Sequence, residues 1–323
     1  MLSNDDDKLR GGGAPASLDP NGDGEDILVN SNHSELAAIL RPFYIQFLSD
    51  LSLKQPFILH EPERSMKVVL EYAERTGNCF PYHPLDVKVW LAIYTWLATL
   101  CDDAERCGTV YYIQGFQERW LLGGKQPTVI TQAFADHLRL TYEYYEPLVA
   151  NLIISRTFEF LTSTALTARK PADIPSPGGQ NFPWWIRDKD GVGEAYAWFT
   201  FPKEKYPDMT VPIEAIYDMA KCISLVNDVL SFYKEEMNGD SDNYIHFKAA
   251  YAGTDIISSL KGTAKEAIEC AQRIENVLEG KGEYQKAWQQ HLTGYVEMHL
   301  MRGRYRLCEV GIGHKPESTE LLK

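Results

Sequence analysis

The feature that most constrains this chain is its helical periodicity, which begins near residue 35 and continues to about residue 308. Ser34 is a suitable N-cap, and apolar residues at helical spacing follow it: Leu36, Ile39, Leu40, Phe43 and Phe47. No stretch shows strict alternation bounded by hairpin turns. We therefore predict an all-α fold, with helices at roughly 34–52, 63–76, 85–107, 109–121, 128–148, 149–168, 213–237, 243–251, 255–279 and 282–308.

Two parts of the chain depart from this pattern. Residues 1–34 contain seven acidic and two basic residues, a Gly-Gly-Gly run and little to bury, so we expect an acidic disordered tail. The segment from Pro171 to Pro212 is rich in proline and then in aromatic residues, which indicates an irregular functional segment. We expect one folded domain over residues 35–312 and a short tail over residues 313–323.

Composition excludes several classes of protein. With 44% apolar residues in 323, the chain can bury a sizeable core. A net charge of -13 argues against bulk attraction to nucleic acid or to an anionic membrane. The six cysteines form no CxxC pair and no secretory signal is evident, so we expect reduced thiols in a cytoplasmic protein. The apolar run from Val89 to Cys101 has 13 residues, too few for a membrane span.

A column of oxygen donors is the sharpest chemical signal. Asn227, Ser231 and Glu235 are spaced i, i+4 and i+8, so on a helix they lie on one face. An amide, a hydroxyl and a carboxylate are hard ligands that suit Mg²⁺. The alternative from spacing alone is a polar stripe that neighbouring helices satisfy.

An acidic pair, Asp102 and Asp103, follows the apolar run of the 85–107 helix. Taken alone, such a pair is an exposed helix end. Together with the donor column it predicts a polar, metal-binding mouth over an apolar cavity in a helical bundle.

These elements resemble the metal-binding motifs of class I terpene cyclases. The pattern (N/D)Dxx(S/T)xxxE fits Asn227 to Glu235 at every defined position, and DDxx(D/E) fits Asp102-Asp103 except that Arg106 stands at the fifth position. Other segments are similar to the fungal trichodiene synthase family: Trp185-Ile186-Arg187, Gly191-Val192-Gly193, Phe201-Pro202-Lys203-Glu204, His299-Leu300 and Arg304-Tyr305-Arg306-Leu307. The resemblance spans about residues 35–310 and implies a single-domain class I terpenoid cyclase helical bundle around a central apolar cavity.

The resemblance also implies roles for individual residues. Asp102, with Asp103 as support, and the Asn227, Ser231 and Glu235 column would bind Mg²⁺, as a cluster of three ions, with Mn²⁺ as the alternative. Four residues would contact the substrate diphosphate: Arg187, Lys234, Arg304 and Tyr305. Gly191 and Gly193 would break a helix beside the cavity. Tyr94, two turns before Asp102, is our candidate for an aromatic pocket wall, although most aromatic residues at helical spacing are core.

The activity implied is a Mg²⁺-dependent sesquiterpene cyclase. It would ionise farnesyl diphosphate and form a C15 hydrocarbon or alcohol of the trichodiene or longiborneol type, in a homodimer without nucleic-acid partners. A prenyl-chain-elongating synthase would need a second aspartate-rich motif, which residues 227–235 do not provide. A non-catalytic protein that binds prenyl diphosphate is the third alternative, and Arg106 is its one indication.

Overall fold

The computed structural model describes residues 38–42, 44–46, 79–102, 110–167 and 178–312, and this part of the chain contains helices and no strand. The prediction of an all-α fold is therefore confirmed. The elements are α3 (Leu85–Asp102), α4 (Val110–Gln114), α5 (Phe116–Leu121), α6 (Val129–Arg139), α7 (Thr141–Tyr144), α8 (Pro147–Thr167), α9 (Phe182–Asp190), α10 (Gly193–Phe199), η1 (Ile213–Ala215), α11 (Ile216–Asn238), α12 (Tyr244–Ala252), α13 (Ile256–Leu278), α14 (Glu283–Met301) and η2 (Gly303–Tyr305).

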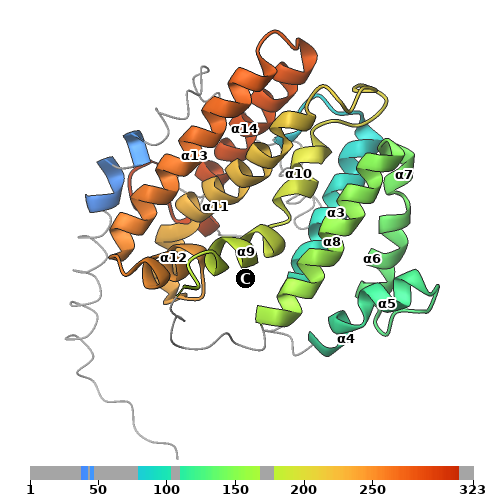
Figure 1. Cartoon of the computed structure of the whole chain (residues 1–323), viewed down its shortest axis with the longest axis horizontal. Helices are drawn as coiled ribbons and strands as arrows, with labels where there is room; N and C mark the ends of the chain where they lie inside the picture. The colour runs from blue at the N-terminus through green and yellow to red at the C-terminus, as the bar shows by residue number, and fades with distance from the viewer. Residues whose placement is uncertain (1–37, 43, 47–78, 103–109, 168–177, 313–323) are drawn as a thin grey trace, which may run out of the picture.

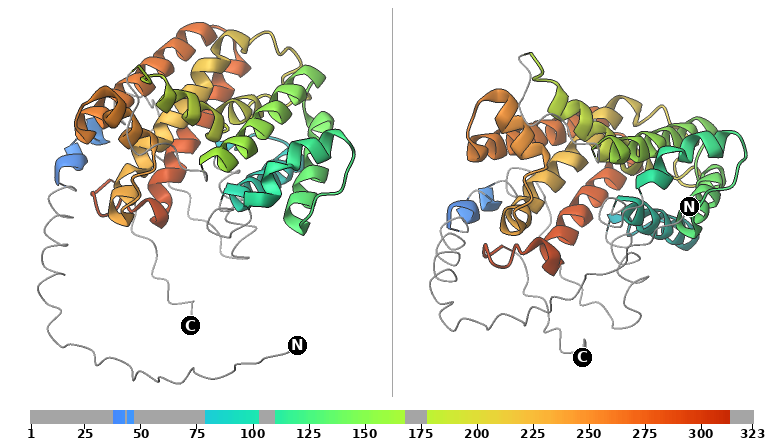
Figure 2. Two further views of the ribbon diagram at one scale, coloured as in Figure 1. Left: turned by 60° about the horizontal axis from the view of Figure 1, so that its bottom comes forward. Right: turned by 90° about the horizontal axis from the view of Figure 1, so that it is seen from below.

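Helix α11 lies at the centre of the arrangement. It packs against α9, α10, α12, α13 and α14, whereas α3 packs against α6 and α8. Helices α9 and α10 contact both α8 and members of the α11 group, so they join the two sets of helices. Figures 1 and 2 show α11 to α14 on one side, α3 to α8 on the other, and α9 between them.

Local sequence sets several helix ends. The side chains of Thr128, Asn243 and Asp255 accept hydrogen bonds from backbone N–H groups at the starts of α6, α12 and α13. Gly239 and Gly253 end α11 and α12 in the left-handed conformation, with φ of 72° and 64°. This conformation costs glycine little because glycine has no Cβ.

Two predicted helices are each divided. The prediction of one helix over 109–121 was wrong, because the regular geometry ends at Gly115, which separates α4 from α5. The prediction over 128–148 was also wrong: α6 and α7 end before Tyr145, whose backbone is extended. Pro147 begins α8, and a proline disfavours helical backbone in the residue before it. The helix predicted over 282–308 ends at Met301 because Arg302 is extended.

The segment between Pro171 and Pro212 was predicted to be irregular, and the structure corrects this. It contains α9 and α10. Pro183 does not interrupt α9, because it lies in the first turn, where a backbone N–H has no partner within the helix. The predicted break between these helices is present at Gly191 and Val192, and Val192 has a φ of 50°. Neither helix was predicted, because each is too short to produce a clear helical periodicity of apolar residues in the sequence.

Most of the buried apolar side chains form one continuous cluster that runs from Leu40 to Val310. No disulfide joins the cysteines within the described ranges. None of the described helices combines the length and the apolar character that crossing a membrane requires. The predicted tails at 1–34 and 313–323, the helix at 63–76 and most of the helix at 34–52 lie outside the described residues, and the domain boundaries remain predictions.

Candidate active site

The predicted donor column lies on α11, in the middle of the bundle. Ser231 is buried and donates a hydrogen bond from Oγ to Glu235 Oε1 at 2.6 Å. Lys234 Nζ lies 3.3 Å from the same carboxylate oxygen. Asn227 Nδ2 is 3.1 Å from Nε2 of His299 on α14. The column therefore combines oxygen donors with one cation, between α11 and α14.

Arg187 lies on α9 and connects that helix to α11. Its Nε donates to both carboxylate oxygens of Asp228, at 2.8 and 3.0 Å. Nη1 donates to Asp190 at 3.3 Å, and Nη2 donates to the backbone oxygen of Ser224 at 3.2 Å. A guanidinium has five N–H groups, so one N–H on each Nη has no acceptor among the described residues. Two donors remain for an anionic ligand.

Burial makes the acidic groups around Arg187 unusual. It raises the pKa of Asp228 to about 7 and that of Asp190 to about 6, although the Arg187 charge opposes both shifts. Asp102, at the end of α3, adds to the rise at Asp190, and Glu235 adds to the rise at Asp228. The carboxylates of Asp102 on α3, Asp190 on α9, and Asp228 and Glu235 on α11 therefore lie close enough to repel one another, and added positive charge would reduce this repulsion.

The C-terminal residues approach the same region. Tyr305 is buried in η2, and its ring centroid is 4.4 Å from that of His299. Arg304 is exposed and its guanidinium lies 5.4 Å from the Tyr305 ring centroid. The Arg306 guanidinium is paired with Glu309, whose carboxylate accepts hydrogen bonds from Nε at 2.8 Å and from Nη2 at 2.9 Å. Arg304 is therefore better placed than Arg306 to bind a ligand.

Tyr94 belongs to a large aromatic cluster. Its ring lies within 5.6 Å, centroid to centroid, of Trp90, Phe134 and Phe199. Its hydroxyl shares a hydrogen bond of 2.6 Å with Thr157, and the side chain is fully buried. The position of Tyr94 at a pocket wall stays a prediction.

Three residues of this region were given no role by the sequence analysis, although Asp228 lies in the Asn227–Glu235 motif and His299 in a segment similar to the family. Asp190 and Asp228 compensate the Arg187 charge, and His299 binds the Asn227 amide. Asp190 is three residues after Arg187, and an i, i+3 pair of opposite charge is a signal that sequence could have supplied. The other two contacts join different helices and have no local signal.

The donor set fits Mg²⁺. Asn227, Ser231 and Glu235 supply oxygens of the kind that this ion prefers. Within the described ranges no three His, Cys, Asp or Glu side chains are grouped where they could bind a metal. The fit therefore depends on the mixed amide, hydroxyl and carboxylate column. Asp103 and Arg106 lie outside the described residues.

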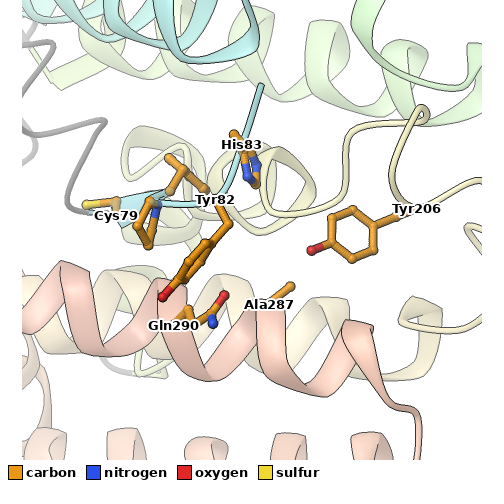
Figure 3. A pocket seen from close by; sticks show the side chains of 8 residues that line it. Cys79, Tyr82, His83, Tyr206, Ala287 and Gln290 are labelled. Atoms are coloured by element: carbon orange, nitrogen blue, oxygen red, sulfur yellow. The ribbon is translucent and has the colours of Figure 1, made fainter. Parts of the chain in front are cut away.

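A small surface pocket lies elsewhere, between the residues just before α3 and helix α14. Figure 3 shows His83, Tyr206 and Gln290 around it, together with Cys79, Tyr82 and Ala287. None of the predicted site residues lines it, so it is distinct from the region around α11.

Comparison with solved structures defines the class of fold. Linalool/nerolidol synthase from Streptomyces clavuligerus aligns with a TM-score of 0.56 at 12% identity, over 81% of this chain and 94% of that chain. Germacradien-4-ol synthase from Streptomyces citricolor aligns with a TM-score of 0.54 at 14% identity, over 83% and 93%. The fold is that of the class I terpene synthases.

Sequence comparison defines the family within that class. The family model described as trichodiene synthase (TRI5) matches residues 46–321. Longiborneol synthase CLM1 of Gibberella zeae is 51% identical over 313 residues, which cover 89% of this chain and 92% of the relative. Terpene synthase BipA of Cochliobolus sativus is 32% identical over 83% of this chain and 89% of its own length. The chain belongs to the trichodiene synthase family, and it is a terpene synthase of the sesquiterpene cyclase type.

Proposed function

We propose that this cyclase binds Mg²⁺ through Asn227, Ser231 and Glu235, with Asp102 opposite, and ionises farnesyl diphosphate. The observation that carries the proposal is the intact donor column on α11, beside Arg187 with two unused N–H donors. Bound Mg²⁺ would supply positive charge that stabilises the departing diphosphate.

The protein's own cations complete the binding of diphosphate. Arg187 offers one N–H from each Nη, and it stays charged because Asp228 and Asp190 raise its pKa. Lys234 lies beside Glu235, and Arg304 is exposed on η2. Charged donors that surround a leaving anion strengthen their interaction as negative charge develops on it.

Aromatic side chains would shield the hydrocarbon cation from water. Burial raises the pKa of Tyr295, on α14, well above its usual value. Arg187 and Tyr196 lie near enough to influence that pKa electrostatically. The Tyr295 hydroxyl is therefore neutral. One face of its ring stacks on His291, at 5.9 Å between centroids, and we propose that the other face stabilises the cation. Tyr94 belongs to the adjoining cluster through Tyr196, at 6.4 Å between ring centroids. A C15 cation held against such rings would cyclise before water or proton loss ends the reaction.

The product class follows from similarity. The relative with 51% identity is named for longiborneol, and the matching family model for trichodiene. We propose a C15 product of one of these two types, a bridged alcohol or a hydrocarbon. We also propose that the protein is cytoplasmic and forms a homodimer. Sedimentation velocity of the purified protein would test the dimer.

The direct experiment is incubation of purified protein with farnesyl diphosphate and Mg²⁺ under a hexane overlay, with an EDTA control. Gas chromatography with mass detection should show a C15 hydrocarbon or alcohol that depends on the metal. Geranyl and geranylgeranyl diphosphates test the chain length. Failure of all three substrates would overturn the proposal.

Substitutions in the donor column test whether Asn227 and Ser231 are needed for activity. The double variant Asn227→Ala with Ser231→Ala should lose metal-dependent diphosphate release and keep its helical circular dichroism spectrum. Asn238→Ala is the matched control, because Asn238 is an exposed asparagine at the end of the same helix. Retained turnover in the double variant would refute the assignment of the column.

A further inference from the structure

His299 is completely buried on α14 between two tyrosine rings. Its exposed fraction is 0%. Its ring centroid lies 4.7 Å from that of Tyr295 and 4.4 Å from that of Tyr305. Close packing of this kind fixes the orientation of the imidazole ring.

Two hydrogen bonds define which ring nitrogen carries the proton. His299 Nδ1 lies 2.8 Å from the backbone oxygen of Tyr295. A carbonyl oxygen only accepts, so Nδ1 must donate. In the neutral ring Nε2 then has a lone pair and no proton. Nε2 therefore accepts from Asn227 Nδ2 at 3.1 Å.

This contact fixes the orientation of the Asn227 amide. An asparagine amide has one donating group and one accepting oxygen, and a flip exchanges their positions. If Nδ2 is held on His299, Oδ1 is directed away from that ring. A metal ion binds the amide oxygen, because the amide nitrogen has no available lone pair.

We propose that His299 is a positioning residue that holds the Asn227 amide in the orientation in which Oδ1 is available to Mg²⁺. The inference rests on the proposed function of the donor column. The imidazole also packs on Tyr305, so one buried ring supports both the predicted metal ligand and the segment that carries Arg304.

Two variants separate the hydrogen bond from the packing. His299→Phe keeps a ring of similar shape and removes the acceptor, so the Asn227 amide can flip. His299→Gln places an amide oxygen near the position of Nε2 and restores an acceptor. Loss of a residue that orients a metal ligand typically reduces metal affinity about 10–100-fold.

The first measurement is turnover as a function of Mg²⁺ concentration. His299→Phe should need about 10–100 times more Mg²⁺ for half-maximal rate and recover much of kcat at saturation. His299→Gln should remain close to the parent protein. His291→Phe is the matched control: it removes another buried imidazole from α14, one bound to the Cys79 carbonyl rather than to Asn227. It should reduce thermal stability without changing the Mg²⁺ dependence.

The second measurement does not use turnover. Mg²⁺ with inorganic diphosphate should raise the Tm of the parent protein and of His299→Gln, and should raise that of His299→Phe much less. The third measurement uses the metal-free protein with ¹⁵N-labelled histidine. Long-range ¹H–¹⁵N correlation should show His299 protonated on Nδ1 alone.

The outcomes distinguish the two proposals. A Tm shift in His299→Phe equal to that of the parent protein, or a proton on Nε2 of His299, would overturn the positioning role and leave the donor column in place. No Tm shift in the parent protein would overturn the proposed metal site, and the positioning role with it.

Discussion

Arg187 and Asp228 form a buried ion pair that joins α9 to α11, with Nε 2.8 and 3.0 Å from the two carboxylate oxygens. The neighbouring residue on α11, Asn227, is bound instead to α14 through His299. Adjacent residues on one helix are therefore held by two different helices. This arrangement fixes α11 between the predicted diphosphate donor and the C-terminal segment.

Removal of one partner of this ion pair should be strongly destabilising. The side chains of Arg187 and Asp228 are only 13% and 10% exposed. Asp228→Leu should lower the free energy of unfolding by about 3 kcal/mol, because the buried Arg187 then keeps only its longer contact with Asp190, at 3.3 Å. Urea unfolding of Asp228→Leu, Arg187→Met and the double variant should give a coupling energy of about 1–3 kcal/mol. Strictly additive effects would mean that the pair contributes nothing to stability.

Gly193 allows close approach of α10 and α11. A Cβ at this position would lie 2.4 Å from the backbone oxygen of Ala220 and 2.8 Å from Ser224 Oγ. Gly193→Ala should therefore force the helices apart, cost about 1–3 kcal/mol and reduce turnover. Gly262→Ala is the control on α13, because its nearest atom would be the flexible Lys248 Nζ at 4.0 Å. Thermal unfolding of both variants checks this prediction, and similar losses in both would contradict it.

Arg156 spans the break between α9 and α10. It donates to Asp188 before the break at 3.3 Å and to Glu194 after it at 2.5 Å, and it also pairs with Glu159 on its own helix. We expect Arg156→Met to cost about 1–2 kcal/mol, since the network is only partly buried. Lys265→Met should cost almost nothing, because the Lys265–Glu269 pair is exposed at 3.8 Å. If urea unfolding gives the two variants equal free energies of unfolding, Arg156 does not stabilise the junction between α9 and α10.

His83 should make stability depend on pH. Burial lowers its pKa to about 4, and its Nε2 lies 2.8 Å from the Phe199 carbonyl. An unfolded histidine has a pKa of about 6.5, so the unfolded chain binds a proton that the folded chain does not. The stability from neutral His83 is present above pH ~6.5 and is lost as the pH falls to ~4, by up to about 3 kcal/mol.

The variant His83→Gln isolates this contribution. Its amide can still donate to the Phe199 carbonyl, but it does not titrate. The variant and the parent protein should have similar Tm at pH 7, and the Tm of the variant should fall less between pH 6.5 and 4. Parallel curves would show that His83 titrates normally in the folded chain.

Much of the fold was predictable because helix formation depends on neighbours in sequence. The long helices α8, α11 and α13 lie close to their predicted ranges, since apolar spacing and caps act locally. The divisions at Gly115 and Tyr145, and the short helices α9 and α10, were not predicted. Packing against α8 and α11 stabilises such short helices, which would be marginal alone.

The sequence by itself determined the donor column, because Asn227, Ser231 and Glu235 belong to one helix and their i, i+4, i+8 spacing places them on one face. Only the tertiary structure decided what surrounds the column. The contact of Arg187 with Asp228 joins residues 41 apart, and that of Asn227 with His299 joins residues 72 apart. Such contacts depend on how separate helices pack, and the local pattern along one helix carries no information about that packing.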